Sequence, residues 1–195
     1  MNELLMKFNE YKSIVNYKVR YEFENGKVME FVPKQNNFPH LIGLHKLVDI
    51  PIIRQFNDKN NQSVGAKFLI SKIKQEKILT EETVKKSVYF PDIEDRYNKF
   101  SKDNILSLSY TDMIVDFDPS QMNSRLKARY VLYEEKDPGT YNHLSIAETA
   151  KNEKYLESFF YEPSDLYLRN QTKIKIKTVK IFDNKGKLFM QDILF

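Results

Sequence analysis

The sequence predicts an α+β fold, with an N-terminal helical half packed on one face of a C-terminal, mainly antiparallel twisted sheet. Apolar residues recur at helical spacing through much of residues 1–110, whereas from about residue 111 short strand-like segments are separated by turn sequences. Helices followed by a meandering series of strands are typical of this class. The 195 residues contain no internal repeat and no low-complexity linker, so we expect a single domain over residues 1–195, helical to about 110 and β-rich from about 111.

The first 32 residues predict a helix followed by a β-hairpin. Apolar side chains recur every three or four residues between Met1 and Asn16, as in an amphipathic helix. Tyr17–Phe23 and Lys27–Val32 are typical of strands. The Asn25-Gly26 dipeptide between them favours a two-residue hairpin turn in which both central residues take positive φ.

Residues 36 to about 100 predict further helices. Asn37 supplies a cap acceptor and Pro39 lacks a backbone donor that a first turn leaves unused, so we expect a helix from here through Leu47. The other helical segments are expected over Ser63–Glu76, from Thr80 until Pro91 interrupts the pattern, and, as a turn or helix, over Asp92–Lys99.

The part of the chain from about residue 111 onward predicts strands. Lys173–Lys177 alternates strictly between lysine and isoleucine, which indicates a half-buried strand with its lysines outward. The strands are expected over Met113–Phe117, Ala128–Tyr133, His143–Thr149, Tyr155–Tyr161 and Lys173–Phe182, with turns at residues 118–120, 137–139, 151–153 and 184–186.

Composition and motifs exclude several function classes. No apolar run approaches the roughly 20 residues of a membrane span, and the N-terminus does not resemble a signal peptide, so we expect a cytoplasmic protein without membrane contact. The absence of cysteine excludes disulfides, a thiol nucleophile and thiolate metal sites. A phosphate-binding loop, a dinucleotide-binding turn and a nucleophile elbow are also absent, so we expect no cofactor.

Positive charge is concentrated near the C-terminus. The whole chain carries 31 Lys and Arg against 27 Asp and Glu, but between Arg169 and Lys187 the only acidic residue is Asp183. Such a stripe attracts phosphate backbones. Lysines on an exposed strand also keep it soluble and protect it from edge pairing, so the pattern leaves both interpretations open.

The most unusual segment is residues 38–47, which contains His40, Gly43 and His45. On a continuous helix the two histidines lie about 140° apart and cannot share a metal ion, and we predict no metal site. A glycine inside a helix costs about 1 kcal/mol relative to alanine, so we expect a neighbouring group to approach its backbone closely. A histidine in a first helical turn favours its neutral form, as a general base requires, although a capping or core histidine would also fit.

His40-Leu41-Ile42-Gly43-Leu44 resembles the His-Leu-x-Gly-Leu signature of the phage-associated branch of the barnase/EndoU/colicin/RelE-like (BECR) nucleases. Ser158-Phe159-Phe160 resembles that family's later Ser/Thr followed by two aromatic residues, with Tyr167 downstream, although Glu157 stands where a proline-containing approach to a threonine is commoner. The resemblance extends loosely from Val32 to Ile181. It implies a metal-independent ribonuclease, toxin or effector tied to phage and mobile elements.

This resemblance implies roles for particular residues. Cleavage by the ribose 2′-hydroxyl needs a proton acceptor, a proton donor and cations around the phosphate. We expect His40 to act as base or acid, Arg129 or Arg169 to clamp the phosphate, Ser158 to donate a hydrogen bond, and Tyr167 to stack or donate its hydroxyl. The predicted catalytic residues are therefore His40, Ser158, Tyr167 and Arg129, and the predicted substrate-binding residues are Arg169, Lys173, Lys175 and Lys46.

The sequence thus favours an endoribonuclease of phage, toxin or defence type, with RNA as its partner and an antitoxin-like inhibitor as a second candidate partner. A catalytically inactive RNA- or protein-binding module on the same scaffold is the main alternative, because function depends on the site and not on the fold. A phage or mobile-element protein that binds an acidic host partner is a third.

Overall fold

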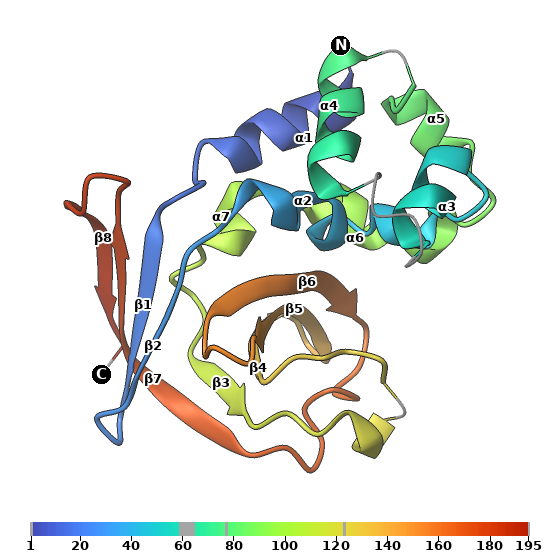
Figure 1. Cartoon of the computed structure of the whole chain (residues 1–195). Coiled ribbons are helices and arrows are strands. Elements are labelled where there is room, and N and C mark those ends of the chain that lie inside the picture. Colours follow the sequence, from blue (N-terminus) through green and yellow to red (C-terminus); the bar gives the residue numbers. More distant parts are fainter. Residues whose placement is uncertain (1, 59–64, 77, 123, 195) are drawn as a thin grey trace.

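The computed structural model describes residues 2–58, 65–76, 78–122 and 124–194, and it confirms the α+β class. The helices lie together on one side of a curled sheet (Figure 1). The described helices are α1 (Glu3–Lys12), α2 (Phe38–Leu41), α3 (Pro51–Asn57), α4 (Ala66–Gln75), α5 (Glu81–Lys85), α6 (Glu94–Lys99) and α7 (Lys102–Ile105), with 3-10 turns η1 (Gln35–Asn37), η2 (Leu44–Lys46), η3 (Phe90–Asp92) and η4 (Pro119–Met122).

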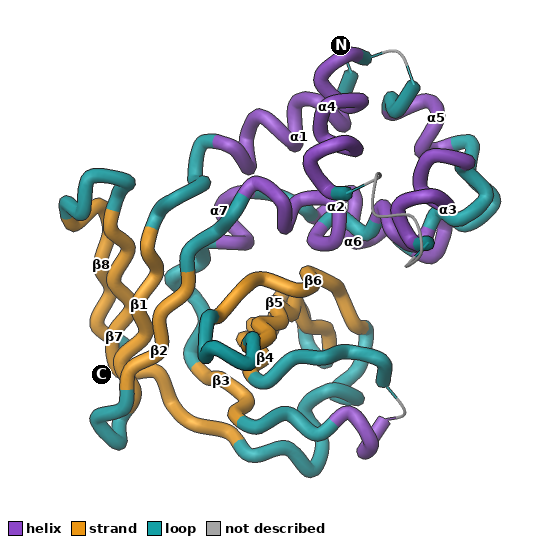
Figure 2. The backbone as a smooth tube through the Cα atoms, viewed as in Figure 1, coloured by secondary structure: helices purple, strands orange, loops and turns teal. Residues whose placement is uncertain are grey.

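The sheet is antiparallel throughout and curls into a half-barrel (Figure 2). Its strands are β1 (Lys18–Phe23), β2 (Val28–Phe31), β3 (Asp112–Val115), β4 (Tyr130–Asp137), β5 (Thr140–Glu148), β6 (Lys154–Glu162), β7 (Lys173–Phe182) and β8 (Leu188–Ile193). Their order is β2-β1-β7-β3-β4-β5-β6, with β8 also paired to β7. The early β1–β2 hairpin is therefore joined to the late strand β7, and β6 lies at the far edge of the sheet.

The main core fills the space between the helices and the sheet. A chain of aromatic rings crosses it, because Phe38 of α2 contacts Phe8 of α1 at 5.2 Å and Phe100 at 5.5 Å between ring centroids. Phe100 in turn lies 6.2 Å from Phe159 of β6. Phe8, Phe38 and Phe159 are fully buried. Burial of such rings is the dominant attraction that holds α1 and α2 on β6.

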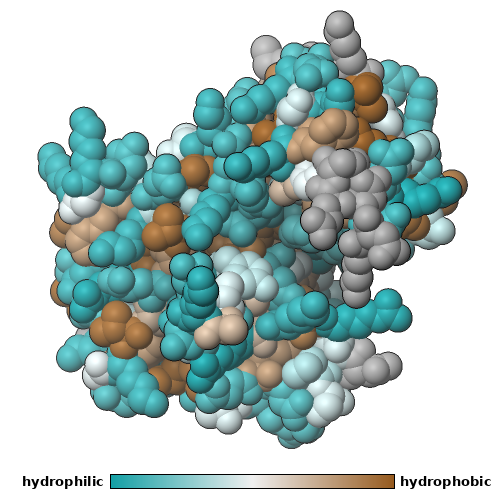
Figure 3. Space-filling view, viewed as in Figure 1, coloured by the Kyte–Doolittle hydropathy of each residue, from teal (hydrophilic) through white to brown (hydrophobic). Residues whose placement is uncertain are grey.

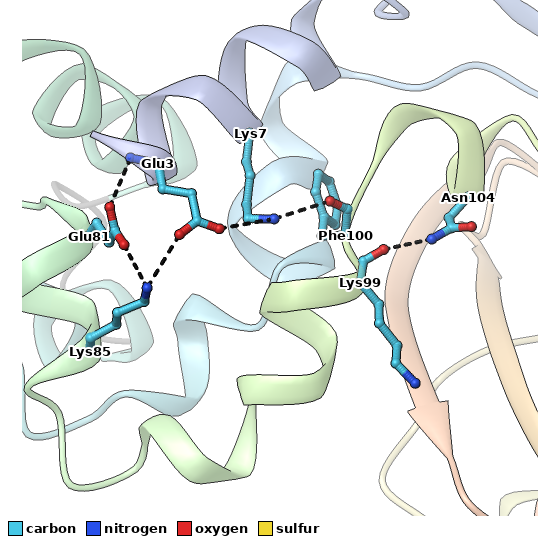
Figure 4. A network of polar contacts seen from close by, with 7 residues as sticks. All are labelled: Glu3, Lys7, Glu81, Lys85, Lys99, Phe100 and Asn104. Atoms are coloured by element: carbon cyan, nitrogen blue, oxygen red, sulfur yellow. Dashed lines mark hydrogen bonds and ion pairs between the residues drawn. The ribbon is translucent and has the colours of Figure 1, made fainter. Parts of the chain in front are cut away.

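Ion pairs fix the outer helices to one another. The Glu3 side chain at the start of α1 pairs with Lys85 of α5 at 3.3 Å and with Lys7 at 3.4 Å, and Glu81 accepts a hydrogen bond from the Glu3 backbone (Figure 4). Lys7 also donates to the carbonyl of Phe100 at 3.4 Å. These contacts join the first helix to segments about 80 to 90 residues later in the sequence.

The predicted hairpin near residue 25 is present, but its turn differs from the expected type. Gly26 has φ of +78°, whereas Asn25 is not among the residues with positive φ. The Asn25 side chain instead accepts a hydrogen bond from the Lys27 backbone at 3.0 Å, and the Gly26 N–H donates to the Phe23 carbonyl. A turn of the commoner hand followed by a left-handed glycine closes the hairpin.

The predicted continuous helix from Asn37 to Leu47 is wrong. Helix α2 ends at Leu41, Gly43 takes φ of +87°, and a separate 3-10 turn follows. A left-handed residue ends a helix, and glycine adopts that conformation without a steric penalty. Gly43 is therefore a helix terminator and not a helical residue.

Other differences concern short or exposed elements. Helices α3 and α7 and strand β8 were not expected; every residue of β8 is exposed, so it lacks the alternation that marks a half-buried strand. The helix expected over Ser63–Glu76 is α4, and Ser63 and Val64 lie outside the described residues. Thr80 caps α5 as expected, since its side chain accepts from the Thr83 N–H.

The surface seen in Figure 3 is mostly hydrophilic, with separate hydrophobic patches. Among the exposed large apolar side chains are Leu188, Phe189 and Ile193 of β8. In the part of the chain that the structure describes, no helix combines the length and the apolar character that crossing a membrane would require.

Candidate active site

A cleft of about 660 Å³ lies where α2, η2 and α6 meet the edge strand β6. Its lining side chains come from five separate parts of the chain, within residues 40–46, 91–96, 124–126, 157–162 and at 167. A volume of this size is typical of sites that hold small molecules or parts of larger ligands. The Asn37 side chain helps to fix this arrangement, because it donates to the Leu156 carbonyl at 3.0 Å and so ties the start of α2 to β6.

Four of the residues predicted from the sequence line this cleft together. They are His40, Lys46, Ser158 and Tyr167, which lie in α2, in η2, in β6 and in the loop after β6. Separate regions of the sequence thus converge on one place. Ser158 is buried and Tyr167 is half-buried, whereas the His40 side chain remains accessible to solvent.

The two arginines predicted to bind phosphate do not line the cleft, and both are paired with carboxylates. Arg129 contacts Asp116 at 3.1 Å and forms a second ion pair with Glu148. Arg169 contacts Asp165, four residues earlier in the same loop, at 2.6 Å. The exposed guanidinium groups are therefore held by neighbouring acids of the same surface.

The lysines of β7 also lie outside the cleft. Lys173 and Lys175 are exposed on that strand, which is separated from β6 in the sheet by β3, β4 and β5. Lys173 lies over the ring of Tyr133 at 5.8 Å, and Lys180, further along β7, pairs with Glu22 at 2.9 Å. The predicted basic stripe is therefore partly neutralised and forms a surface separate from the cleft.

The two histidines of the unusual segment are neighbours, which corrects the angle expected from a continuous helix. Because the chain turns at Gly43, the ring centroids of His40 and His45 lie 4.9 Å apart. The His40 ring also contacts Phe56 at 5.2 Å. Within the described residues, no three histidine, aspartate or glutamate side chains are grouped so that they could hold a metal ion.

Gly43 is required for a second reason, since another side chain fills the space where its Cβ would be. An added Cβ would lie 2.9 Å from Cδ of Arg96 and 2.9 Å from Cγ2 of Ile93. The close approach expected from the sequence is therefore present. The approaching groups are the Ile93 side chain and the stem of Arg96, and Nη1 of Arg96 donates to the His40 carbonyl at 3.4 Å.

The electrostatic environment makes the two histidines different bases. Desolvation by the cleft walls, followed by the charge of Arg96, lowers the pKa of His40. Burial lowers the pKa of His45 to about 3, and the charges of His40, Arg96 and Lys46 act in the same direction. His45 therefore stays neutral at ordinary pH, and His40 is the imidazole of the pair that can exchange a proton with a bound molecule.

A bulge in β6 presents Glu157 and Ser158 to the cleft. The register with β5 shifts so that Ser145 opposes Ser158 while Ile146 opposes Leu156, which leaves Glu157 as the extra residue. Bulges re-aim side chains in this way next to active sites. Burial raises the pKa of the Glu157 carboxyl, although its Oε1 accepts from the Lys127 N–H at 2.8 Å.

Sequence reasoning missed Arg96, Glu157 and Arg125, which all line the cleft. Only Glu157 had a signal, as the neighbour of the predicted Ser158. Arg96 follows three acidic positions in residues 92–95 and looks like an ordinary charged residue of an exposed helix. The residues around Arg96 in the sequence give no sign that its side chain packs against Gly43.

An aromatic cluster holds Tyr167 in the wall of the cleft. The ring of His143 from β5 stacks on Phe160 of β6 with centroids 4.7 Å apart, and Tyr167 lies 4.8 Å from Phe160 and 5.6 Å from His143. His143 is fully buried, and burial lowers its pKa to about 3. The third histidine of the chain therefore packs behind the cleft as a neutral ring.

Comparison with models of protein families shows which family the chain belongs to. The model of the phage-Barnase-EndoU-ColicinE5/D-RelE like nuclease4 family matches residues 4–188. The chain belongs to this family. No match emerged from the comparison with curated proteins or from the comparison with solved structures.

Membership in the phage BECR-like nuclease family confirms the resemblance drawn from the short motifs at His40 and Ser158. The match spans every segment that lines the cleft. The family consists of phage-related nucleases, and nucleic acid is accordingly the class of partner that membership indicates.

The first prediction concerns the two constraints on Gly43. Gly43→Ala should lower the free energy of unfolding through the left-handed backbone, by about 1–2 kcal/mol, and through the contacts with Arg96 and Ile93, by a further 1–3 kcal/mol or so. Gly139→Ala is the matched control, because Gly139 has φ of +78° with nothing within 4 Å of an added Cβ. Denaturant unfolding measures both; equal losses would contradict the close packing.

The second prediction concerns pH. The unfolded chain binds a proton at His143 near pH 6.5 while the folded protein resists it to about pH 3, so the free energy of unfolding should fall as pH drops below 6.5. The slope contributed by His143 is about 1.4 kcal/mol per pH unit. His143→Phe keeps an aromatic ring on Phe160 and should reduce the slope between pH 6.5 and 5 by about 1.4 kcal/mol per pH unit, leaving the similar slope that His45 contributes. An unchanged slope in the variant would show that His143 does not resist protonation.

Proposed function

We propose that this protein is a metal-independent endoribonuclease that cleaves RNA with the ribose 2′-hydroxyl as nucleophile. One observation carries the proposal. His40, Ser158 and Tyr167, predicted from separate parts of the sequence for this chemistry, line the same cleft, and Arg96 lines it with them. Family membership supports the nuclease activity, and the choice of RNA rests on the side chains available for proton transfer.

The reaction that fits these groups is an internal transfer at phosphorus. The 2′-oxygen forms a bond to the adjacent phosphorus while the bond from phosphorus to the 5′-oxygen breaks, which leaves a 2′,3′-cyclic phosphate and a free 5′-hydroxyl. The proton of the 2′-hydroxyl goes to the neutral imidazole of His40. This step needs an unprotonated base, which the lowered pKa of His40 provides at neutral pH.

The leaving 5′-oxygen needs a proton, and Glu157 is the candidate donor. Burial raises the pKa of its carboxyl, which favours the protonated form that a general acid needs, and Glu157 lines the same cleft. Burial lowers the pKa of the His40 imidazole and raises the pKa of the Glu157 carboxyl, so both shifts favour the uncharged forms in which imidazole acts as a base and a carboxyl acts as an acid.

Two further groups act on the substrate without exchanging protons. The Ser158 hydroxyl donates a hydrogen bond to a phosphate oxygen, and Tyr167 supports a base or donates its hydroxyl. The exposed lysines of β7, including Lys173 and Lys175, are candidates for contacts with the RNA backbone away from the cleft. The proposal includes a biological role as a toxin or defence enzyme, whose activity a neutralising protein partner holds in check.

The third prediction tests the base. His40→Ala should lower the rate of cleavage of a fluorogenic RNA oligonucleotide by roughly 10²- to 10⁴-fold, because general base catalysis contributes about that factor. The same oligonucleotide with a 2′-deoxyribose at the cleaved position should be inert, and the wild-type rate should be unchanged in EDTA.

Three results would argue against this reading. An active His40→Ala protein would show that His40 is not the base. Cleavage of the deoxy substrate would show that the 2′-hydroxyl is not the nucleophile, and loss of activity in EDTA would show that the reaction depends on a metal ion. RNA binding without turnover by the wild type would instead favour the catalytically inactive binding module.

The fourth prediction separates the acid from the base. Glu157→Gln should slow RNA cleavage by roughly 10²-fold or more, because an amide cannot supply the proton. The same variant should be close to wild type on a nucleoside 3′-aryl phosphate, whose phenolate leaves without protonation, whereas His40→Ala should be impaired on both substrates. Equal losses on the two substrates in Glu157→Gln would rule out a general acid at this position.

A further inference from the structure

Arg96 is a buried cation to which the described residues offer no carboxylate partner. Its side chain is 8% exposed, yet among the residues that the structure describes no acid lies within ion-pair distance of it. Its Nη1 donates a hydrogen bond to the His40 carbonyl at 3.4 Å. Arg20, Arg129 and Arg169 lie at more exposed positions, and each is paired with at least one carboxylate.

Burial of a guanidinium group is unfavourable unless other groups accept its hydrogen bonds and balance its charge. A guanidinium carries five N–H donors. Burial without partners is unfavourable, because these donors lose the hydrogen bonds that water would otherwise accept from them. The desolvation is visible in the pKa of Arg96, which burial lowers to about 10. Although Asp92 and Asp95 line the same cleft, neither neutralises Arg96. The arrangement suits an anion that arrives from outside the chain.

The guanidinium is also held in a fixed place. The Arg96 stem packs where Gly43 has no Cβ, and its head group reaches the carbonyl of His40. A planar fork whose stem is fixed binds a phosphate through two parallel hydrogen bonds with little loss of side-chain freedom. The same contacts place the cation against the backbone of His40, close enough for its charge to lower the pKa of the imidazole that the proposed reaction uses.

We propose that Arg96, seated against Gly43, forms a phosphate-binding site in the cleft that holds the reacting phosphodiester next to His40. The assignment of the phosphodiester as ligand rests on the proposed ribonuclease function. Binding of a phosphate ion to the same guanidinium does not depend on it, so the two can be tested separately.

The fifth prediction uses inorganic phosphate as the probe. Titration of the wild-type protein followed by NMR should shift the side-chain Nε–H signal of Arg96 and the ring signals of His40. A bound anion offsets the charge of Arg96, so saturation with phosphate should also raise the pKa of His40. The wild type alone decides this part, without any variant that has to fold. Unmoved Arg96 and His40 signals at high phosphate concentration would overturn the proposal.

Variants then locate the site. Arg96→Gln should weaken phosphate binding by roughly 10- to 100-fold, and Arg96→Lys should give an intermediate loss, because lysine keeps the charge but not the fork. Arg20→Gln is the matched control, since Arg20 pairs with Glu22 and Glu30 on β1 and β2, outside the cleft. Unchanged binding in folded Arg96→Gln would place the phosphate elsewhere and overturn the proposal.

Cleavage assays on the same proteins distinguish the two proposals. If phosphate binds through Arg96 but the wild type does not cleave RNA, the phosphate site stands and the proposed function fails. If the wild type cleaves RNA and Arg96→Gln cleaves it equally well with unchanged phosphate binding, the function stands and the site at Arg96 fails.

Discussion

The close approach of the Arg96 side chain to the Gly43 backbone is the contact on which the cleft depends. The space left by the missing Cβ admits the arginine stem, and the positive φ at the same residue ends α2 after a single turn. Both effects need glycine, and they act on the wall of the cleft that the helical segments form. The turn brings His45 beside His40, while the packing brings a buried cation beneath them. A larger residue at this position would disturb both together.

The sheet supplies the other wall through an irregularity and not through its regular pattern. Strict alternation along β6 would place Leu156, Ser158 and Phe160 on one face and Glu157 and Phe159 on the other. The bulge resets this alternation, so that Leu156 and Phe159 both enter the main core while Glu157, Ser158 and Phe160 line the cleft. The acid and the hydroxyl therefore face the histidines because one extra residue interrupts the ladder.

The difference between what the sequence predicted and what it did not follows from the range of the interactions. Periodicity and turn residues identified the fold class and most strands, since those signals are local. The motif residues His40 and Ser158 were found because short patterns preserve them. The role of Arg96 was invisible, because it arises from packing against a glycine distant in the sequence. Arg129 and Arg169 were attractive as isolated cations, and only the folded surface reveals the acids that hold them.

The proximity of Arg96 to His40 has a consequence for the order of events in the proposed reaction. In the free protein the charge of Arg96 disfavours protonation of His40, so the imidazole is unprotonated and ready when RNA arrives. A phosphate bound at Arg96 brings negative charge that offsets this effect, and the imidazole then becomes a stronger base at the moment when it must accept the 2′-proton. A cation paired with a protein carboxylate would lack this property, because its charge would already be neutralised before the substrate bound. The absence of an acidic partner for Arg96 among the described residues is therefore what would link substrate binding to proton transfer in this cleft.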